Sequence, residues 1–532
     1  MRKTLLLLAV LMLITAQIFG AGASALGDAD GSYTLPSGRV SYPINTDAVL
    51  SIWTGVNSNV APYFTNYSEV PFYRGWSERT GIRVNYVHPP AGAENEQFNI
   101  IVASGDLPDI FWRNFLTHPG GPERAIDEGI IIAKNDLIAR YAPYLSDILR
   151  NNPDWDRLVK TDVGTYYTFP NIREDVFLSI WQGPIIRSDF LTQLGLAPPV
   201  TFDDWYAMLS AFRDRLNIQA PLSMPYNNPM LMYGYGFEMG WFIDANNRVS
   251  WGRSQPAYRD YLEMMARWYR EGLLDPDIAT ITAAQRATKM SNGTAGATEG
   301  ALSSGMGVWL PAGRTITPNY SLMGVSNPVR NRGDRLTMIN LDNPFSGANG
   351  SVSISGRSRH PDVAARFLDW AYGPEGHRYS NFGTEGVSYT LVNGQPILTD
   401  LILRNPAGLS IGHAAAQHVN ANYGGPHIQS ASIMRQLFAH PEQVAAIEAW
   451  TIDDPFRHKL PPLTPTPEES TEMAQIIQAI NTYANEMMVR FILGLDPVNA
   501  STFDAYIDQI RRMGLDRAAE IQNAAYRRFL AR

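Results

Sequence analysis

Short apolar runs and helical faces alternate along the chain, and this alternation predicts strands and helices in turn. Residues 48–53 and 82–87 have the pattern of strands. Phe72 and Trp76 lie between them, four residues apart, as they would on one face of a helix. Strand, helix and strand in this order are typical of a βαβ unit, in which the two strands run parallel. The pattern therefore predicts an α/β protein with mainly parallel sheets flanked by helices.

The stretch 184–205 predicts two helices separated by a sharp stop. Apolar residues recur at helical spacing up to Gly195, which can take the left-handed conformation that ends a helix, and a Pro pair follows it. Thr201 is a suitable N-cap for a second helix, with Asp204 three residues later and the apolar face beginning at Trp205. These residues define where both helices begin and end.

Length and charge narrow the class of protein. A chain of 532 residues is too long for one ordinary hydrophobic core, so two or more lobes are expected. Long helices are predicted over 256–271 and 467–493, and no segment repeats at a fixed period. The formal net charge of −8 argues against a nucleic-acid partner.

Several stretches resemble segments of the extracellular solute-binding proteins (family 1) of carbohydrate ABC importers. The sequence I-R-S-D-F-L at 186–191, followed by L-G-L at 194–196, is similar to a family segment near the start of the second lobe. The sequences A-S-G-D-L-P-D-I at 103–110 and F-G-T-E-G-V-S-Y at 382–389 are close to two further family segments. Such matches run in one order from about residue 48 to about residue 528.

The resemblance implies a two-lobed periplasmic-binding-protein fold of type II, with the ligand cleft between the lobes. One lobe would comprise residues 48–172 and 346–405, and the other residues 173–345 and 406–532, so the chain would cross near 172, 345 and 405. The implied function is capture of a saccharide, specifically an oligosaccharide, by hinge closure and its delivery to the permease subunits of an ABC transporter in the membrane. We expect a monomer with no cofactor, no metal ion and no covalent chemistry.

The beginning of the sequence has the pattern of a secretory signal peptide over residues 1–25. Two basic residues precede an apolar run of about a dozen residues, and small residues place the cleavage site near Ala23 or Ala25. Residues 26–47, rich in Gly, Ser, Pro and Asp, are expected to form a linker. The chain has no Cys, so it lacks the acylated cysteine that anchors many proteins of the resembled family. A periplasmic protein that is not lipid-anchored is expected.

A sugar-binding site needs aromatic faces for the apolar sides of the ring and polar groups for its hydroxyls. Aromatic residues with polar neighbours lie at predicted strand ends and loops of this chain. The candidate ligand-binding residues of this kind are Trp53, Asn57, Trp112, Arg113, Asn114, Trp181, Tyr226, Asn227, Trp309 and Arg314. Glu385 joins them from the family-like segment 382–389, although it is equally suited to tie a loop. For each tryptophan, packing in a core is the alternative.

Enzyme and metal motifs are weak in this sequence. G-L-S-I-G at 408–412 fits the nucleophile-elbow pattern, but Pro406 stands where a strand should precede the serine. Asp244 begins a segment like a calcium loop, yet Arg248 occupies its third ligand position, so we interpret the segment as a surface turn. A secreted glycoside hydrolase, which needs only two suitably spaced carboxylates, and a carbohydrate-binding protein without a transporter remain the alternatives.

Overall fold

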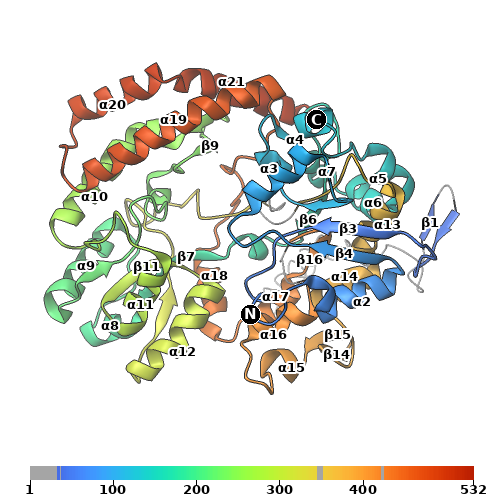
Figure 1. Ribbon diagram of the computed structural model, residues 1–532. Coiled ribbons are helices and arrows are strands. Elements are labelled where there is room, and N and C mark those ends of the chain that lie inside the picture. The colour runs from blue at the N-terminus through green and yellow to red at the C-terminus, as the bar shows by residue number, and fades with distance from the viewer. Residues whose placement is uncertain (1–32, 36–37, 344–350, 421–423) are drawn as a thin grey trace, which may run out of the picture. The chain divides into compact units, whose positions relative to one another are not determined.

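Residues 33–35, 38–343, 351–420 and 424–532 are described by the computed structural model shown in Figure 1. They divide into two compact units. Unit 1 comprises the described parts of Met1–His118, Pro122–Ile172 and Phe345–Gln429, and unit 2 comprises those of Pro119–Gly121, Arg173–Pro344 and Ser430–Arg532. The predicted signal peptide and the first residues of the predicted linker lie outside the described residues.

A six-stranded sheet of order β16-β6-β13-β5-β3-β4 forms the centre of unit 1. In chain order its strands are β3 (Val49–Trp53), β4 (Arg83–Val87), β5 (Ile110–Trp112), β6 (Phe169–Arg173), β13 (Ser351–Ile354) and β16 (His427–Gln429). As predicted, β3 runs parallel to β4, because α2 (Pro71–Thr80) returns the chain between them. β3, β4, β5 and β6 run in one direction, as predicted for a mainly parallel sheet, and β13 is antiparallel to its neighbours β5 and β6. Its direction is reversed because the chain enters β13 on its return from unit 2.

Helices and the antiparallel hairpin of β14 (Tyr389–Val392) and β15 (Gln395–Leu398) flank this sheet in unit 1. The helices are α3 (Glu94–Ser104), α4 (Gly121–Asp127), α5 (Asn135–Tyr141), α6 (Pro143–Asn151), α7 (Pro153–Val159), α13 (Pro361–Asp369), α14 (Pro374–Phe382), α15 (Asp400–Leu403) and α16 (Ile411–His418), besides α2. In the core, the ring of Trp76 stacks on that of Phe367 with centroids 4.6 Å apart, which ties α2 to α13.

Unit 2 is built on a four-stranded sheet of order β12-β7-β11-β8. The strands are β7 (Gln182–Arg187), β8 (Ala220–Leu222), β11 (Ala295–Ala301) and β12 (Leu322–Gly324). β8 is parallel to β11, and β7 is antiparallel to both β11 and β12, so β8, β11 and β12 run in one direction. The sheet is therefore mainly parallel, as predicted, and the exception is β7, the strand by which the chain enters this unit.

The helices of unit 2 cover this sheet and extend beyond it. They are α8 (Ser188–Leu194), α9 (Phe202–Leu216), α10 (Pro256–Arg270), α11 (Ala283–Asn292), α12 (Gly307–Ile316), α17 (Ala431–Leu437), α18 (Pro441–Trp450), α19 (Pro467–Ile492), α20 (Ala500–Arg512) and α21 (Leu515–Leu530). Figure 1 shows α19, in red, lying along α10, with α21 beside α19 and close to β10 (Val249–Trp251), which pairs with β9 (Trp241–Ile243). The C-terminal helices are thus part of the packing of unit 2.

The helix boundaries predicted for residues 184–205 are confirmed. Gly195 ends α8 with φ 66°, in the left-handed region. Thr201 and Asp204 form a reciprocal capping box at the start of α9. Arg187, which is buried, forms a bidentate ion pair with Asp189 at 2.8 and 2.6 Å. The family-like segment therefore serves structure in unit 2.

The transitions between the units differ from the prediction at one place. Apart from the three residues Pro119–Gly121, which group with unit 2, the first two fall after Ile172 and after residue 344, near the predicted positions. The third follows Gln429 instead of lying near 405, because β16 joins the sheet of unit 1 beside β6 and α16 lies against α2. Residues 406–429 accordingly belong to unit 1 and not to the second lobe as predicted.

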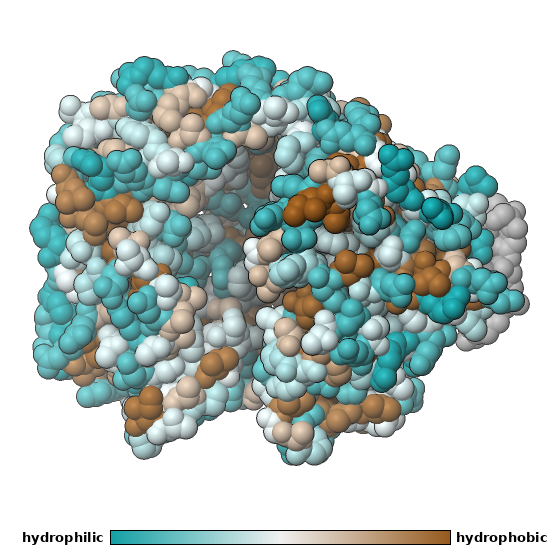
Figure 2. Space-filling view, in the orientation of Figure 1, coloured by the Kyte–Doolittle hydropathy of each residue, from teal (hydrophilic) through white to brown (hydrophobic). Residues whose placement is uncertain are grey.

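The described part of the predicted linker is partly ordered as strands. β1 (Tyr33–Leu35) and β2 (Gly38–Val40) pair antiparallel with each other. Figure 2 shows that the visible surface of the described residues is mostly polar, with small scattered apolar patches. No helix among the described residues has both the length and the apolar character needed to cross a bilayer.

Candidate functional site

Polar and aromatic side chains gather at one edge of the sheet of unit 2. β8 and β11 are parallel and end at this edge, and the antiparallel β7 begins there. Trp181 immediately precedes β7, Tyr226 and Asn228 follow β8, and Glu299 lies near the end of β11. Strand ends in open α/β sheets are the places where loops can present side chains to a ligand.

Trp181 is the exposed aromatic residue of this edge. Its side chain is 43% exposed, although an indole usually packs in a core. Its backbone is fixed, because the carbonyl oxygen accepts a hydrogen bond of 2.9 Å from the amide of Leu302 at the end of β11. Trp181 therefore offers a positioned ring surface to solvent.

Glu299 is a buried carboxylate held between two amide side chains. Its Oε1 accepts a hydrogen bond of 2.9 Å from Asn340 Nδ2, and its Oε2 accepts one from Asn228 Nδ2. Burial raises the pKa of Glu299, and the bonds from Asn340 and Asn228 and the nearby Arg286 oppose that rise. The guanidinium of Arg286 donates to the carbonyl oxygen of Glu299 at 3.0 Å.

Glu299 has no aromatic neighbour in the sequence, so the pattern of polar residues beside aromatic ones does not include it. The available signal was a single acidic residue in the strand A-G-A-T-E-G-A, whose other residues are small or uncharged. A charged side chain that is only 6% exposed in such a strand requires partners, which Asn228 and Asn340 supply.

Two ion pairs lie near this cluster. Arg173 Nη1 is 3.0 Å from Asp342 Oδ2, and Lys459 Nζ is 3.5 Å from Glu238 Oε1. Burial raises the pKa of the Tyr233 hydroxyl, and the carboxylates of Glu238, Glu299 and Asp342 raise it further. Those three acids therefore lie close enough to one buried tyrosine of unit 2 for their charges to act on its pKa.

The corresponding edge of unit 1 is made by the ends of the parallel strands β3, β4 and β5. Trp53 is buried there between Phe98 and Phe111, at centroid distances of 6.1 and 6.3 Å. Trp112 is also buried, and the backbone of Gly425 lies so close to its indole that a Cβ would be 2.0 Å from the ring. In this structure both tryptophans pack in the interior of unit 1.

The polar candidates of unit 1 mostly bond to the protein itself. Asn57 Oδ1 accepts from the amide of Asn59 at 2.8 Å. Asn114 caps the short helix Phe115–Thr117, since its Oδ1 accepts from the amide of Leu116 at 2.9 Å. Arg113 donates to Asn95 at 3.0 Å and lies 4.1 Å above the ring of Phe98.

Tyr63 and His413 form an exposed pair that the sequence analysis did not identify. The Tyr63 hydroxyl and His413 Nδ1 are 3.3 Å apart, and Tyr63 is 44% exposed. His413 stands in the first turn of α16, which brings the segment 411–418 to the loop that follows β3. Ser410 caps α16 and accepts from the amide of His413, so G-L-S-I-G begins a helix and is not the strand-to-helix turn of a nucleophile elbow.

Three predicted residues lie away from these groups or below the surface. Arg314 of α12 pairs with Glu442 of α18 at 2.7 Å. Trp309 is buried, with its ring against Gly300. Glu385 is exposed in the loop before β14. The neighbouring Thr384 accepts a hydrogen bond of 3.3 Å from Arg79, which lies in the last turn of α2. Because α2 leads into β4, this loop lies near the start of β4 and not near its end.

The two remaining candidates follow β8. Tyr226 is half-buried, and its amide donates to the carbonyl oxygen of Ile278 at 2.9 Å, while Asn227 is exposed. Asn227 stands directly before the buried Asn228, so the loop presents one amide to solvent and directs the next one to Glu299. Of the predicted set, Trp181, Tyr226 and Asn227 therefore lie together at the edge of unit 2.

Asp244 stabilises a turn in the manner the sequence indicates. Its carboxylate accepts from the amides of Asn246 and Arg248 at 2.8 and 3.0 Å and from the Ser250 hydroxyl at 2.8 Å, between β9 and β10. Within the described ranges, no group of three or more His, Asp or Glu side chains is arranged to hold a metal ion.

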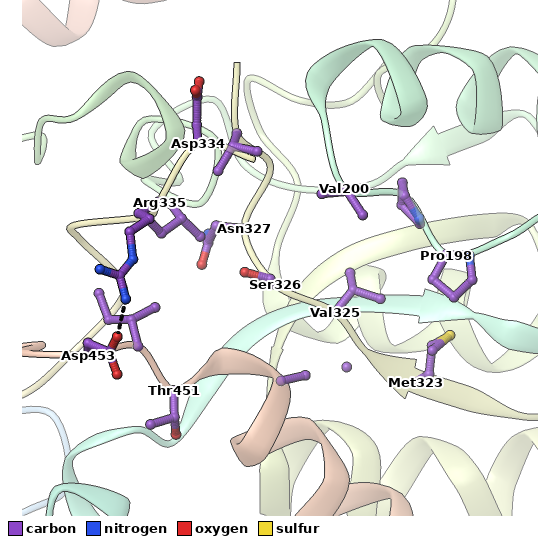
Figure 3. Close-up of a pocket in the computed structure, with 16 residues that line it drawn as sticks. Pro198, Val200, Met323, Val325, Ser326, Asn327, Asp334, Arg335, Thr451 and Asp453 are labelled. Carbon is purple, nitrogen blue, oxygen red and sulfur yellow. Dashed lines mark hydrogen bonds and ion pairs between the residues drawn. The ribbon is translucent and has the colours of Figure 1, made fainter. Parts of the chain in front are cut away.

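A separate cavity of about 560 Å³ opens beside β12, the outermost strand of the unit 2 sheet. Figure 3 shows its apolar wall, with Pro198, Val200, Met323 and Val325, and the ion pair of Arg335 with Asp453 at its rim, 2.6 Å long. None of the predicted site residues lines it. The cavity therefore contributes nothing to the assignment of the candidate site.

Solved structures with the same fold include several solute-binding proteins. The alginate-binding protein AlgQ2, solved without calcium ion, has a TM-score of 0.72 at 24% identity, and the match covers 90% of this chain and 98% of that one. An HMO-binding, ABC-transporter-associated protein from Bifidobacterium longum infantis has a TM-score of 0.71 at 16% identity, covering 91% and 99% of the two chains. At such identities these likenesses show the fold alone.

Two relatives match parts of the sequence. The fructooligosaccharide ABC transporter substrate-binding protein FusA of Streptococcus pneumoniae is 28% identical over 217 residues, 40% of this chain and 39% of FusA. Lipoprotein LipO of Bacillus subtilis is 22% identical over 344 residues, 61% of this chain and 65% of LipO. Both matches thus span less than two thirds of the relative's length.

A family model covers a larger share of the chain. The model of the bacterial extracellular solute-binding proteins matches residues 61–378, which is more than half of the sequence and includes all four strands of the unit 2 sheet. The match extends through the segments on which the resemblance was based at 103–110 and 186–196. The chain belongs to the bacterial extracellular solute-binding protein family.

Proposed function

We propose that this protein captures an oligosaccharide outside the cytoplasmic membrane and delivers it to the permease subunits of an ABC transporter. The observation that carries the proposal is the exposed indole of Trp181 at the same sheet edge as the polar cluster around Glu299. An aromatic face with hydrogen-bonding groups beside it suits a sugar ring, which has apolar faces and a rim of hydroxyls.

The names of relatives support the choice of ligand. FusA is named for fructooligosaccharides, and its structures in complex with kestose and fructo-nystose share the fold of this chain, with TM-scores of 0.69 and 0.71. Other proteins with this fold are named for alginate and HMO binding. We carry the saccharide class, and no particular sugar, over to this protein.

The proposed mechanism is ligand-dependent closure. A ligand that contacts both units favours the closed conformation by the difference between its affinities for the closed and open forms. The permease would recognise that conformation. We further propose export by residues 1–25, periplasmic action without a lipid anchor, and binding as a monomer without chemical conversion of the ligand.

Calorimetric titration of the purified protein with a panel of neutral and acidic oligosaccharides tests this function. At least one saccharide should bind saturably to the wild type. Trp181→Ala should weaken that binding at least about fivefold, which corresponds to about 1 kcal/mol, because a stacked ring surface is lost. Trp181→Tyr keeps an aromatic face and should retain most of the affinity.

Two results would contradict the proposal. One is the absence of a binding heat across the whole panel; the other is release of reducing ends when the protein is incubated with the saccharide that it binds, since a glycoside hydrolase would produce them. Equal affinity of Trp181→Ala and wild type would remove Trp181 from the site while leaving the binding function.

A further inference from the structure

An exposed aromatic pair lies beside the loop that follows β3, at the edge of unit 1 where the predicted tryptophans are buried. We propose that Tyr63, Asn59 and His413 form a sugar-binding subsite of unit 1. In it the tyrosine ring stacks on a sugar ring, and the other two side chains bond its hydroxyl groups. This inference deepens the saccharide-binding function proposed above and rests on it.

The loop after β3 is fixed at both of its ends by the residue that follows β4. The amide of Tyr67 donates to His88 Nε2 at 3.1 Å, so Nδ1 carries the proton of the neutral imidazole and donates to the carbonyl oxygen of Thr54 at 2.7 Å. The amide of Thr54 also donates to the carbonyl oxygen of Val87, at 3.1 Å. A loop held in this way at the carboxyl ends of parallel strands can present side chains to a ligand in a fixed position.

Asn59 and Tyr63 lie on one side of this loop and meet the start of α16. Within residues 57–64, two amides donate to the carbonyl oxygen four residues earlier, at 3.0 and 3.1 Å, as in a helical turn. Residues four apart in such a turn lie side by side. The Tyr63 hydroxyl is 3.3 Å from His413 Nδ1, and a Cβ on Gly412 would be 3.7 Å from Asn59 Oδ1. The three side chains are therefore neighbours, although they come from two distant segments.

Solvent reaches this group, and hydrogen-bonding capacity is free in it. Tyr63 is 44% exposed, and Asn59 and His413 are half-buried. Within the described part of the chain, neither the side-chain amide of Asn59 nor Nε2 of His413 takes part in a hydrogen bond. A ligand can thus contact the ring and both polar groups without breaking a hydrogen bond within the protein.

A sugar hydroxyl suits these groups whichever nitrogen of His413 carries the proton. Where the Tyr63 hydroxyl donates to Nδ1, Nε2 carries the proton and donates; where Nδ1 donates, Nε2 accepts. A hydroxyl can take either role, and the amide of Asn59 offers both a donor and an acceptor. A sugar ring also has the apolar face that stacks on a tyrosine. Residues 54–66 include no acidic or basic side chain, so stacking and hydrogen bonds are the contacts that this loop provides.

Calorimetric titration with a saccharide that binds the wild type tests the subsite. Tyr63→Ala should weaken binding at least about fivefold, because the stacking surface is lost. Tyr63→Phe keeps the ring and should retain most of the affinity. Asn59→Ala should weaken binding about threefold, because it removes a hydrogen-bonding partner of the ligand.

Leu391→Ala is the matched control. Leu391 is also 44% exposed in unit 1, but it lies in the hairpin of β14 and β15, away from the loop after β3. This variant should bind like the wild type.

Chemical protection gives a second measurement that needs no substitution. Tetranitromethane nitrates exposed tyrosines, and mass spectrometry of peptides measures the extent at each position. A saturating saccharide should slow the nitration of Tyr63 severalfold, because the bound sugar covers the ring. The half-buried Tyr526 on α21 is the internal reference, and its nitration should not change.

Three results would overturn the inference and leave saccharide capture standing. They are wild-type affinity of Tyr63→Ala, an equal loss of affinity in Leu391→Ala, and nitration of Tyr63 at the same rate with and without bound saccharide. Wild-type affinity of Asn59→Ala would remove Asn59 from the subsite. Failure of every saccharide to bind the wild type would overturn the proposed function and this inference together.

Discussion

Lys134 places a cation in the interior of unit 1. The residue is fully buried, and its Nζ donates to the carbonyl oxygen of Ile132 at 2.7 Å. Among the described residues no acidic side chain forms an ion pair with it, and burial holds the pKa of Lys134 well below its usual value. The folded protein therefore binds fewer protons at this site than the unfolded chain, so the free energy of unfolding should rise with pH up to the usual lysine pKa of about 10.4.

Lys134→Met should stabilise the protein by about 1 to 3 kcal/mol at pH 7, because it replaces a desolvated amine by an apolar chain of similar length. It should also flatten the rise of stability with pH. Urea unfolding at pH 6, 7 and 9 measures both effects. Lys289→Met is the matched control: Lys289 bonds Asp275 and Asp277 at 2.7 and 2.8 Å, so its loss should destabilise. A less stable Lys134→Met would show that the amine makes a net favourable contribution.

The candidate site illustrates what a sequence can specify for single residues. The pairing of aromatic with polar residues also selected Trp309 and Arg314, which lie in helix α12 and not at a strand end. It could not distinguish the exposed Trp181 from the buried Trp53 and Trp112. Exposure depends on what packs over the ring, and for Trp112 this is Gly425, more than three hundred residues later in the chain. Glu299 was missed for the same reason, since its partner Asn340 is remote in sequence.

At the scale of elements, a side chain of α13 caps the N-terminus of α6. Asp369 accepts hydrogen bonds from the amides of Tyr144 and Leu145 at 3.2 and 2.8 Å, and these amides belong to the first turn of α6, which has no partner for them. Burial raises the pKa of Asp369 to about 8, although the two amides oppose that rise. A distant carboxyl group thus performs the task of an N-cap side chain.

Asp369→Ala should lower the free energy of unfolding by about 2 to 4 kcal/mol, because two buried amides lose their acceptors. Asp369→Asn keeps one acceptor oxygen and should cost less. With its raised pKa the folded Asp369 retains a proton that the unfolded chain releases above about pH 4, so its contribution to stability declines between about pH 4 and about pH 8. Asp369→Asn should remove this decline in urea unfolding curves; an unchanged slope would show that Asp369 does not titrate in this range.

Elements with local signals were predictable, and those defined by distant pairing were not. The capping box of Thr201 and Asp204 and the end of α8 at Gly195 depend on neighbouring residues and are confirmed. The directions of β7 and β13 are set by how the chain enters and re-enters each unit, which no local pattern encodes. The same is true of β16. Its three residues pair with β6, so the chain leaves unit 1 for the last time only after residue 429.

At the scale of the whole molecule, each unit has its own sheet and its own hydrophobic clusters. The chain passes between the units at 172, 344 and 429. The candidate groups of unit 1, such as Tyr63 and His413, and those of unit 2, such as Trp181 and Glu299, belong to different sheets. Units with separate cores can move as bodies about their connecting segments, as hinge closure requires.

Small-angle X-ray scattering should therefore show a smaller radius of gyration when a binding saccharide saturates the protein. A ligand with contacts on both units favours the state in which all of them are made, and it shifts the population by its differential affinity alone. Trp181→Ala measured at the same ligand concentration, below saturation for that variant, should stay closer to the unliganded curve. Unchanged scattering of the wild type at full calorimetric saturation would mean that the ligand binds one unit, and that the permease recognises something other than closure.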